Sequence, residues 1–129
     1  MARLILDSGA VIALARRDMR VRAFISRAVR NGDLVAVPAV VLAETTRGGP
    51  RDAPVNQVLK DIDEITPATE RTARAAGRLL GASDLSDATV DALIAAEAVL
   101  HGSAVVLTGD PDDLRSLVGG QRHVLVHAI

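Results

Sequence analysis

The sequence lacks cysteine, tryptophan and tyrosine, and Phe24 is its single phenylalanine. Without cysteine the chain can form no disulfide, no zinc–thiolate site and no thiol nucleophile. The scarcity of aromatic side chains argues against the RRM and OB classes of protein, which stack nucleobases on aromatic platforms. Because hydrophobic residues still make up 49% of the chain, the core must consist of Val, Leu, Ile and Ala.

Long apolar segments are absent too. No apolar run approaches the roughly 20 residues that a membrane-spanning helix needs. The first residues do not resemble a secretory signal, because Asp7 and Ser8 interrupt the apolar stretch and Arg16 and Arg17 follow it. We therefore expect a cytoplasmic protein that has no contact with a membrane. The length of 129 residues predicts one domain that covers residues 1–129.

The charges nearly cancel, but their distribution along the chain is uneven. There are 15 Lys and Arg residues against 16 Asp and Glu residues, for a net charge of −1. Arginines crowd residues 16–30, and aspartates crowd residues 84–113. Two solvated faces are the commoner explanation of such runs. An acidic cluster beside a basic segment would also suit a metal-dependent enzyme that acts on a phosphodiester.

Apolar strands alternate with helical patterns along the chain, which predicts an α/β fold with a parallel sheet and helices on both faces. The segment GGPRDAPV is expected to be a flexible loop. Strands are expected at 3–6, 34–37, 62–66, 103–107 and 123–129, and helices at about 8–16, 19–31, 38–47, 55–61, 67–81, 86–101 and 110–118.

Two of the expected strands end in an aspartate. LILD places Asp7 after the first strand, and VVLTGD places Asp110 after the fourth. Either residue alone is more often a helix N-cap than a ligand. In open parallel sheets, however, binding sites form beyond the carboxyl ends of the strands. The coincidence therefore favours a site at this edge of the sheet.

Glu44 continues an apolar stripe with Val37, Val40 and Val41 at helical spacing, so we expect it to face the sheet. An unpaired buried carboxylate costs several kcal/mol and is normally avoided. A salt bridge to Arg47 or Arg51 would explain Glu44 structurally, and this explanation has about the same weight as a functional one.

Asp91 repeats the pattern, because it shares a helical face with Ile94, Ala95 and Ala98. We expect it to lie too far into its helix to act as a cap. Asp87 is expected one turn earlier on the same side, where a capping role explains it equally well.

Four acids, Asp7, Glu44, Asp91 and Asp110, are thus expected in one cleft. At about 4 Å and an effective dielectric constant near 20, each pair of like charges costs about 4 kcal/mol. A fold keeps such a group only if something neutralises it. Oxygen ligands without nearby His or Cys favour a hard cation, Mg²⁺ or Mn²⁺.

Four segments together resemble the motifs of PIN-domain ribonucleases, most closely the VapC-type toxins of bacterial toxin–antitoxin pairs. The segments are LILDSGAVIAL, PAVVLAE, VDALIAAEAVLHG and VVLTGDPDDL, in matching order from Asp7 to Asp113. The resemblance implies a three-layer α/β/α sandwich around a central parallel sheet. It also implies an endoribonuclease that uses Mg²⁺, for which Mn²⁺ can substitute. A cognate antitoxin protein that holds the enzyme inactive is implied as a partner, as is a homodimer.

Carried over position by position, the resemblance makes Asp7, Glu44, Asp91 and Asp110 the catalytic acids. Asp7, Asp91 and Asp110 would ligate or orient the metal, and Glu44 would position or deprotonate the attacking water. Two further acids and two small hydroxyl residues fall at auxiliary positions: Asp87, Asp113, Ser8 and Thr108.

Two other classes of function compete with this interpretation. A PIN-like binding module would engage a protein partner or RNA and cut nothing, which leaves the retained acids unexplained. A phosphatase of the HAD type would need Asp-x-Asp after the first strand, whereas the sequence there is Asp7-Ser8-Gly9.

The sequence indicates the residues that would contact RNA less clearly than it indicates the acids of the site. Arg16, Arg17 and Arg20 could bind RNA phosphates, because arginine offers bidentate contacts to phosphate. A solvated helix face, or part of a groove for the antitoxin, would explain them equally well. His123 and His127 lie about 13 Å apart along an expected strand, too far to share a metal ion.

Overall fold

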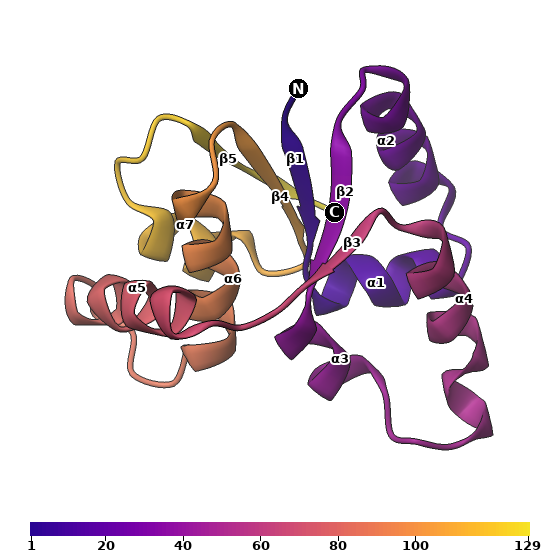
Figure 1. The fold of residues 1–129 in the computed structure, drawn as a ribbon, viewed down its shortest axis with the longest axis horizontal. Helices are drawn as coiled ribbons and strands as arrows, with labels where there is room; N and C mark the ends of the chain where they lie inside the picture. Colours follow the sequence, from indigo (N-terminus) through magenta and orange to yellow (C-terminus); the bar gives the residue numbers. More distant parts are fainter.

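The computed structural model describes residues 1–129 and contains one five-stranded sheet in the order β3-β2-β1-β4-β5. Every neighbouring pair of strands is parallel. The sheet therefore brings the carboxyl ends of all strands to one edge, with β1 in the middle (Figure 1). The strands are β1 (Arg3–Leu6), β2 (Leu34–Pro38), β3 (Glu64–Thr66), β4 (Ala104–Thr108) and β5 (Val124–Ala128).

Helices cover both faces of the sheet. In Figure 1, α5, α6 and α7 lie on one side, α1, α2 and α4 lie on the other, and α3 lies beyond the carboxyl ends of the strands. This arrangement confirms the predicted three-layer α/β/α sandwich. The helices are α1 (Ser8–Ala15), α2 (Met19–Arg30), α3 (Ala39–Thr45), α4 (Ala53–Asp61), α5 (Glu70–Gly81), α6 (Thr89–Leu100) and α7 (Pro111–Val118).

The core is aliphatic throughout, as the composition predicted. Every buried hydrophobic residue is a Val, Leu, Ile or Ala. The central strand β1 contributes Leu4, Ile5 and Leu6, each at most 2% exposed. Small alanines on α6, such as Ala95 and Ala98, are fully buried and allow this helix to lie close against the sheet. No helix combines the length and the apolarity needed to span a bilayer.

The expected loop at 48–55 is wrong from Pro50 onward. Residues Pro50–Asp52 form a 3₁₀ turn, and α4 begins at Ala53. The carboxylate of Asp52 organises the preceding residues, because it accepts hydrogen bonds from the backbone N–H groups of Arg47 (3.0 Å) and Gly48 (2.7 Å). A buried acid, 8% exposed, thus replaces the flexibility that the glycines and proline suggested.

Helix α6 also starts later than expected, at Thr89. The polar segment before it forms a turn, in which the Ser83 hydroxyl donates to the carbonyl of Leu80 and accepts from the N–H of Leu85. This turn extends the end of α5 and delays the next helix by three residues relative to the expected start at 86. Because of this shift, Asp87 lies before α6, and Asp91 lies in the first turn of this helix.

Asp52 provides a test of how the loop after α3 is held. Replacement by alanine removes charge-assisted bonds to two backbone N–H groups and leaves both donors without their partner. We expect Asp52→Ala to lower the free energy of unfolding by about 2 kcal/mol, measured by urea denaturation. The matched control is Asp61→Ala, an exposed aspartate on α4, which should change stability by less than about 0.5 kcal/mol. Equal stability of the two variants would contradict this account.

Candidate functional site

Asp7 is both a helix cap and an acid at the end of a strand. It is the N-cap of α1, and its Oδ1 accepts a hydrogen bond of 2.9 Å from the N–H of Ala10. Its Oδ2 accepts hydrogen bonds from the Thr108 hydroxyl and from the N–H of Gly109 (3.3 Å). The side chain is 5% exposed, so these donors compensate a buried negative charge. The two explanations offered for Asp7 are therefore compatible.

Thr108 connects the ends of two neighbouring strands. It is fully buried at the end of β4, donates its hydroxyl proton to Asp7 and accepts a hydrogen bond of 2.8 Å from the N–H of Asp110. The hydroxyl of this residue, for which the resemblance implied an auxiliary position, thus bonds the carboxylate of Asp7. Thr108 fixes the start of the β4–α7 connection relative to Asp7.

Gly9, which the sequence analysis did not single out, permits this arrangement. A Cβ atom on Gly9 would lie 3.2 Å from the backbone nitrogen of Gly109 and 3.3 Å from Oδ1 of Asp7. The first turn of α1 and the β4–α7 connection therefore approach too closely for a side chain at position 9 unless a neighbour shifts by a few tenths of an ångström. The only signal in the sequence was that Gly9 lies two residues after the strand-end Asp7.

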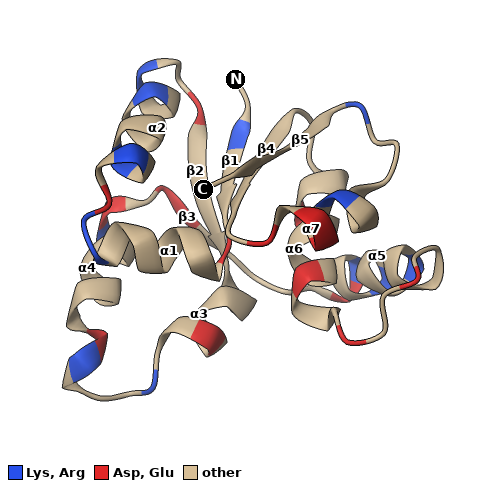
Figure 2. Cartoon of the chain, turned by 180° about the vertical axis from the view of Figure 1, so that it is seen from behind, with Lys and Arg blue, Asp and Glu red and all other residues tan.

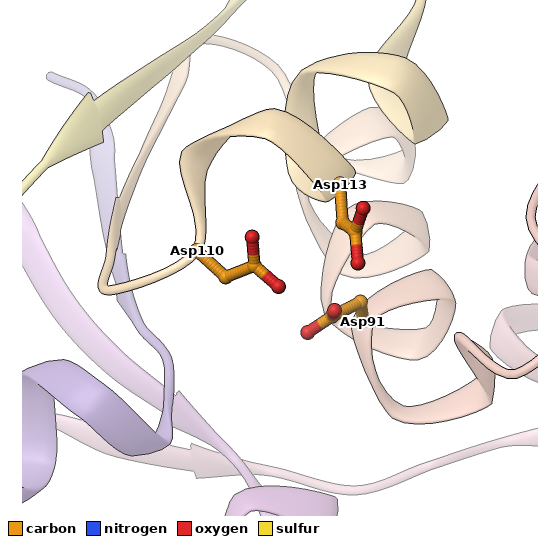
Figure 3. Close-up of side chains that lie close together, drawn as sticks. All are labelled: Asp91, Asp110 and Asp113. Atoms are coloured by element: carbon orange, nitrogen blue, oxygen red, sulfur yellow. The ribbon is translucent and has the colours of Figure 1, made fainter.

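Three carboxylates from two helices form a compact acidic cluster. Each of Asp91, Asp110 and Asp113 offers a carboxylate oxygen, and these oxygens lie within 4.8 Å of one another. Figure 3 shows Asp110 and Asp113, at the start of α7, on the same side as Asp91 of α6. Asp113 had only an auxiliary position in the prediction, and Asp7 is not within this group. None of the three forms an ion pair with a cationic side chain.

Asp91 does not cap α6, whose N-cap is Ala88, but it lies nearer the helix start than expected. Because α6 begins at Thr89, Asp91 belongs to the first turn, where the helix dipole favours a negative charge. Burial nevertheless raises the pKa of Asp91 to about 6, with further contributions from the negative charges of Asp110, Asp113, Asp7 and Glu44. Repulsion within the acidic group therefore opposes ionisation of Asp91 at neutral pH.

The pKa of Asp113 is raised by the same kinds of cause. Its pKa is raised by partial burial and by the negative charge of Asp110, with which it also shares a side-chain hydrogen bond, and then by the charge of Asp112. Two neighbouring carboxyl groups with raised pKa values indicate a site that is short of positive charge.

Glu44 lies on α3 but is exposed, so the prediction that it faces the sheet is wrong. The helix ends one residue later, at Thr45, and its last turn extends past the sheet while Val41 remains fully buried. The alternative explanation, a salt bridge to Arg47 or Arg51, does not hold either, because Glu44 forms no ion pair and the Arg47 guanidinium donates to the carbonyls of Ala43 and Thr46. The negative charge of Glu44 nevertheless contributes to the raised pKa of Asp91, so Glu44 lies near enough for its charge to act on the acidic cluster.

The remaining candidates lie outside the cluster. Asp87 is exposed and precedes α6, so the prediction that it lies one turn before Asp91 on the same helix is wrong. Ser8 is the half-buried first residue of α1. Arg16, Arg17 and Arg20 are exposed around the α1–α2 junction, and none forms an ion pair. Figure 2 shows acidic segments on α3, α6 and α7 and basic segments along α2.

The donor set of the acidic cluster fits a hard divalent cation. It offers carboxylate oxygens without nitrogen or sulfur, and its charges are otherwise uncompensated. Mg²⁺, Mn²⁺ and Ca²⁺ prefer such ligands. Asp91, Asp110 and Asp113 could hold the ion, with Asp7 and Glu44 close enough for their charges to act on Asp91.

Comparisons with known proteins agree with this architecture. Residues 4–118 match the family model described as PIN domain. No curated protein sequence matches the chain. A chain of VapBC2 from Rickettsia felis, solved bound to a DNA fragment from their promoter, has 14% sequence identity and a TM-score of 0.78, with 98% of each chain covered.

Two further crystal structures are similar. DNA-bound VapBC from Salmonella typhimurium has 15% identity and a TM-score of 0.71, with 99% of this chain and 98% of that chain covered. FitAcB from Neisseria gonorrhoeae has 20% identity and a TM-score of 0.64, with 95% of each chain covered. At these identities the structural similarity establishes the fold alone.

The raised pKa of Asp91 predicts how stability depends on pH. The unfolded chain loses this proton near the ordinary value of 3.8, whereas the folded chain keeps it up to about pH 6. This contribution to folding is therefore fully present below about pH 4 and is lost as the pH rises through 6. We expect Asp91→Asn to be more stable than the wild type at pH 8 without divalent cations, and the two to converge below pH 4. Urea denaturation in EDTA at several pH values measures this difference, and a less stable variant at pH 8 would contradict it.

Thr108 provides a second test. Thr108→Val keeps the shape of the side chain but removes the donor to Asp7 and the acceptor for the N–H of Asp110. We expect a loss of about 2–3 kcal/mol in the free energy of unfolding, because buried polar groups lose their partners. Thr108→Ser retains the hydroxyl and should recover more than half of this loss. If serine is no better than valine, packing of the methyl group and not the hydrogen bonds determines the effect.

Proposed function

The chain belongs to the PIN domain family, and from this membership we propose that it is a metal-dependent endoribonuclease that hydrolyses RNA phosphodiesters. The observation that carries the proposal is the cluster of Asp91, Asp110 and Asp113, whose carboxylates lie together without a cationic partner. An acidic cluster of this kind is poorly suited to binding an anionic strand unless a cation mediates the contact.

Mg²⁺ is the proposed ion, and Mn²⁺ can substitute for it because both prefer carboxylate and water ligands. Asp7, Asp91 and Asp110 are the proposed ligands, directly or through water, and Asp113 joins them because it lies in the same cluster. Oδ2 of Asp7 already accepts two hydrogen bonds, but Oδ1 accepts only one and retains capacity for a second partner. When bound, the ion polarises the phosphate and makes water a better nucleophile.

The chain's own residues then have distinct roles. Glu44, which is exposed on α3 and whose charge acts on Asp91, is the proposed acceptor of the proton of the attacking water. The water oxygen bonds to phosphorus as the bond to the 3′-oxygen breaks, and the proton passes to that oxygen. The products are a 5′-phosphate and a 3′-hydroxyl. Thr108 is a positioning residue, because it holds Asp7 and the backbone of Asp110 together. Ser8 and Asp87 are proposed auxiliaries.

We place the enzyme in a toxin–antitoxin pair. The sequence motifs resemble VapC-type toxins, and the similar structures include VapBC2 from Rickettsia felis and VapBC from Salmonella typhimurium. The proposed partner is a cognate antitoxin that offers a cationic group to the acids, and the proposed assembly contains a homodimer of this chain in the cytoplasm. Arg16, Arg17 and Arg20 are the proposed contacts to RNA phosphates.

The test is RNA cleavage by the purified chain, with structured RNAs, tRNAs included, in Mg²⁺, Mn²⁺ or EDTA. We expect discrete products with 5′-phosphates that require the metal. Asp91→Asn should reduce the rate by more than about 100-fold, beyond the loss typical of residues that only support a ligand. Asp61→Asn, an exposed acid on α4, is the matched control and should cleave as the wild type does.

Two outcomes would overturn the proposal. Equal, EDTA-resistant cleavage by the wild type and Asp91→Asn would indicate a contaminating nuclease. A metal-dependent rise in the melting temperature without cleavage of any RNA would favour the binding module, since a ligand stabilises the folded state whether or not chemistry follows.

A further inference from the structure

A groove lies between α2 and the strands β4 and β5. Its part nearest the carboxyl end of β4 has a volume of about 330 Å³ and is lined by Arg20, Phe24, Leu107 and His127, among others. A second hollow of about 100 Å³ shares Phe24 and is lined by Arg27, further along α2. The two hollows therefore adjoin Phe24 along one face of this helix, and together they are called the groove.

The α2 wall of the groove carries cationic groups at regular spacing. Arg20, Phe24, Arg27 and Asn31 follow one another at intervals of four, three and four residues, which places them on one side of the helix. Neither guanidinium forms an ion pair. At 1.5 Å per residue, Arg20 and Arg27 lie about 10 Å apart along the helix axis. The guanidinium groups of Arg20 and Arg27, on one side of the groove and without ion pairs, are suited to bind the phosphates of a nucleic-acid strand.

The acids near the groove are already used by the backbone. Asp18 caps α2, since its Oδ1 accepts from the N–H groups of Arg20 (2.9 Å) and Val21 (3.1 Å). Asp33 accepts a hydrogen bond of 2.9 Å from the N–H of Ala2. One oxygen of each carboxylate is therefore engaged by the backbone, and neither acid forms an ion pair with Arg20 or Arg27.

The groove also contains a pair of rings in contact. The ring centroids of Phe24 and His127 lie 4.4 Å apart, with a tilt of 32°. Phe24 is half-buried against the core and His127 is exposed, so the His127 ring is accessible to a ligand and rests on an apolar support that includes Leu107. A nucleobase stacks on such a surface regardless of its sequence.

The position of the groove relates it to the acids. Leu107 directly precedes Thr108, whose hydroxyl bonds Asp7. We infer that the groove binds a single-stranded segment of RNA next to the scissile phosphate, with an unpaired base against Phe24 and His127 and its phosphates on Arg20 and Arg27. This inference rests on the proposed nuclease function. It also specifies the substrate, because a base within a duplex could not reach the rings.

Photo-crosslinking tests the contact without any cleavage. The full chain, in EDTA, is irradiated with a single-stranded RNA that contains 5-iodouracil, and the attached peptide is identified by mass spectrometry. We expect attachment at Phe24 or His127, and competition by unlabelled single strand but not by the same sequence as a duplex. Attachment confined to other residues would overturn the inference.

Substitutions then measure the contribution of the groove. His127→Ala and Arg20→Ala should each weaken binding of the single strand about tenfold, and His127→Phe should restore it because stacking is retained. In cleavage, KM should rise while kcat stays within twofold, since the acids are untouched. Two matched controls are His123→Ala, directly before β5, and Arg22→Ala, on α2. Neither residue lines the groove.

The outcomes separate the two proposals. A wild type that cuts no RNA contradicts the nuclease function itself. A wild type that cuts, together with groove variants whose KM and affinity are unchanged, overturns the groove alone. Variants that bind RNA normally but lose affinity for the antitoxin would assign the groove to the protein partner and would equally overturn its assignment to RNA.

Discussion

The structure depends on the link between Asp7 and Thr108. These residues end the two central strands, and the hydroxyl of one donates to the carboxylate of the other in a fully buried setting. The same hydroxyl accepts from the N–H of Asp110, so the connection that leads to α7 starts from a fixed point. A buried aspartate is normally unfavourable, and here three donors compensate it. Gly9 allows the two backbones to come close enough for these bonds to form.

The acids differ in what compensates them. Asp7 accepts hydrogen bonds from three protein donors, whereas Asp91 and Asp113 have raised pKa values and no cationic partner. The fold thus supplies donors to the acid that joins its strands and leaves the neighbouring acids without a cation, although all these residues lie at one edge of one sheet.

Much of the fold could be predicted from the sequence, because strand and helix periodicities agree with the order of elements. LILD and VVLTGD are buried strands that end at the same edge, as predicted. The start of α6 could not be predicted, since serines and aspartates at 83–87 suit a helix N-terminus as well as the turn they form. The exposure of Glu44 depends on where α3 ends relative to the sheet, and the helical periodicity of the sequence does not predict that end. The grouping of Asp113 with Asp91 depends on how α6 and α7 pack, and no local pattern encodes that contact.

The order of strands also has a consequence for synthesis. The cluster needs Asp91 from α6, Asp110 from the N-cap of α7 and Asp113 from α7. Strand β1, at the middle of the sheet, leaves the ribosome first. The strand that carries Thr108 must insert beside β1 after about four-fifths of the chain has been made. Asp7 is therefore synthesised long before Asp91, Asp110 and Asp113 are all present in the chain. If the chain cuts RNA, the ribosome that makes it is exposed to the finished site only at the end of translation.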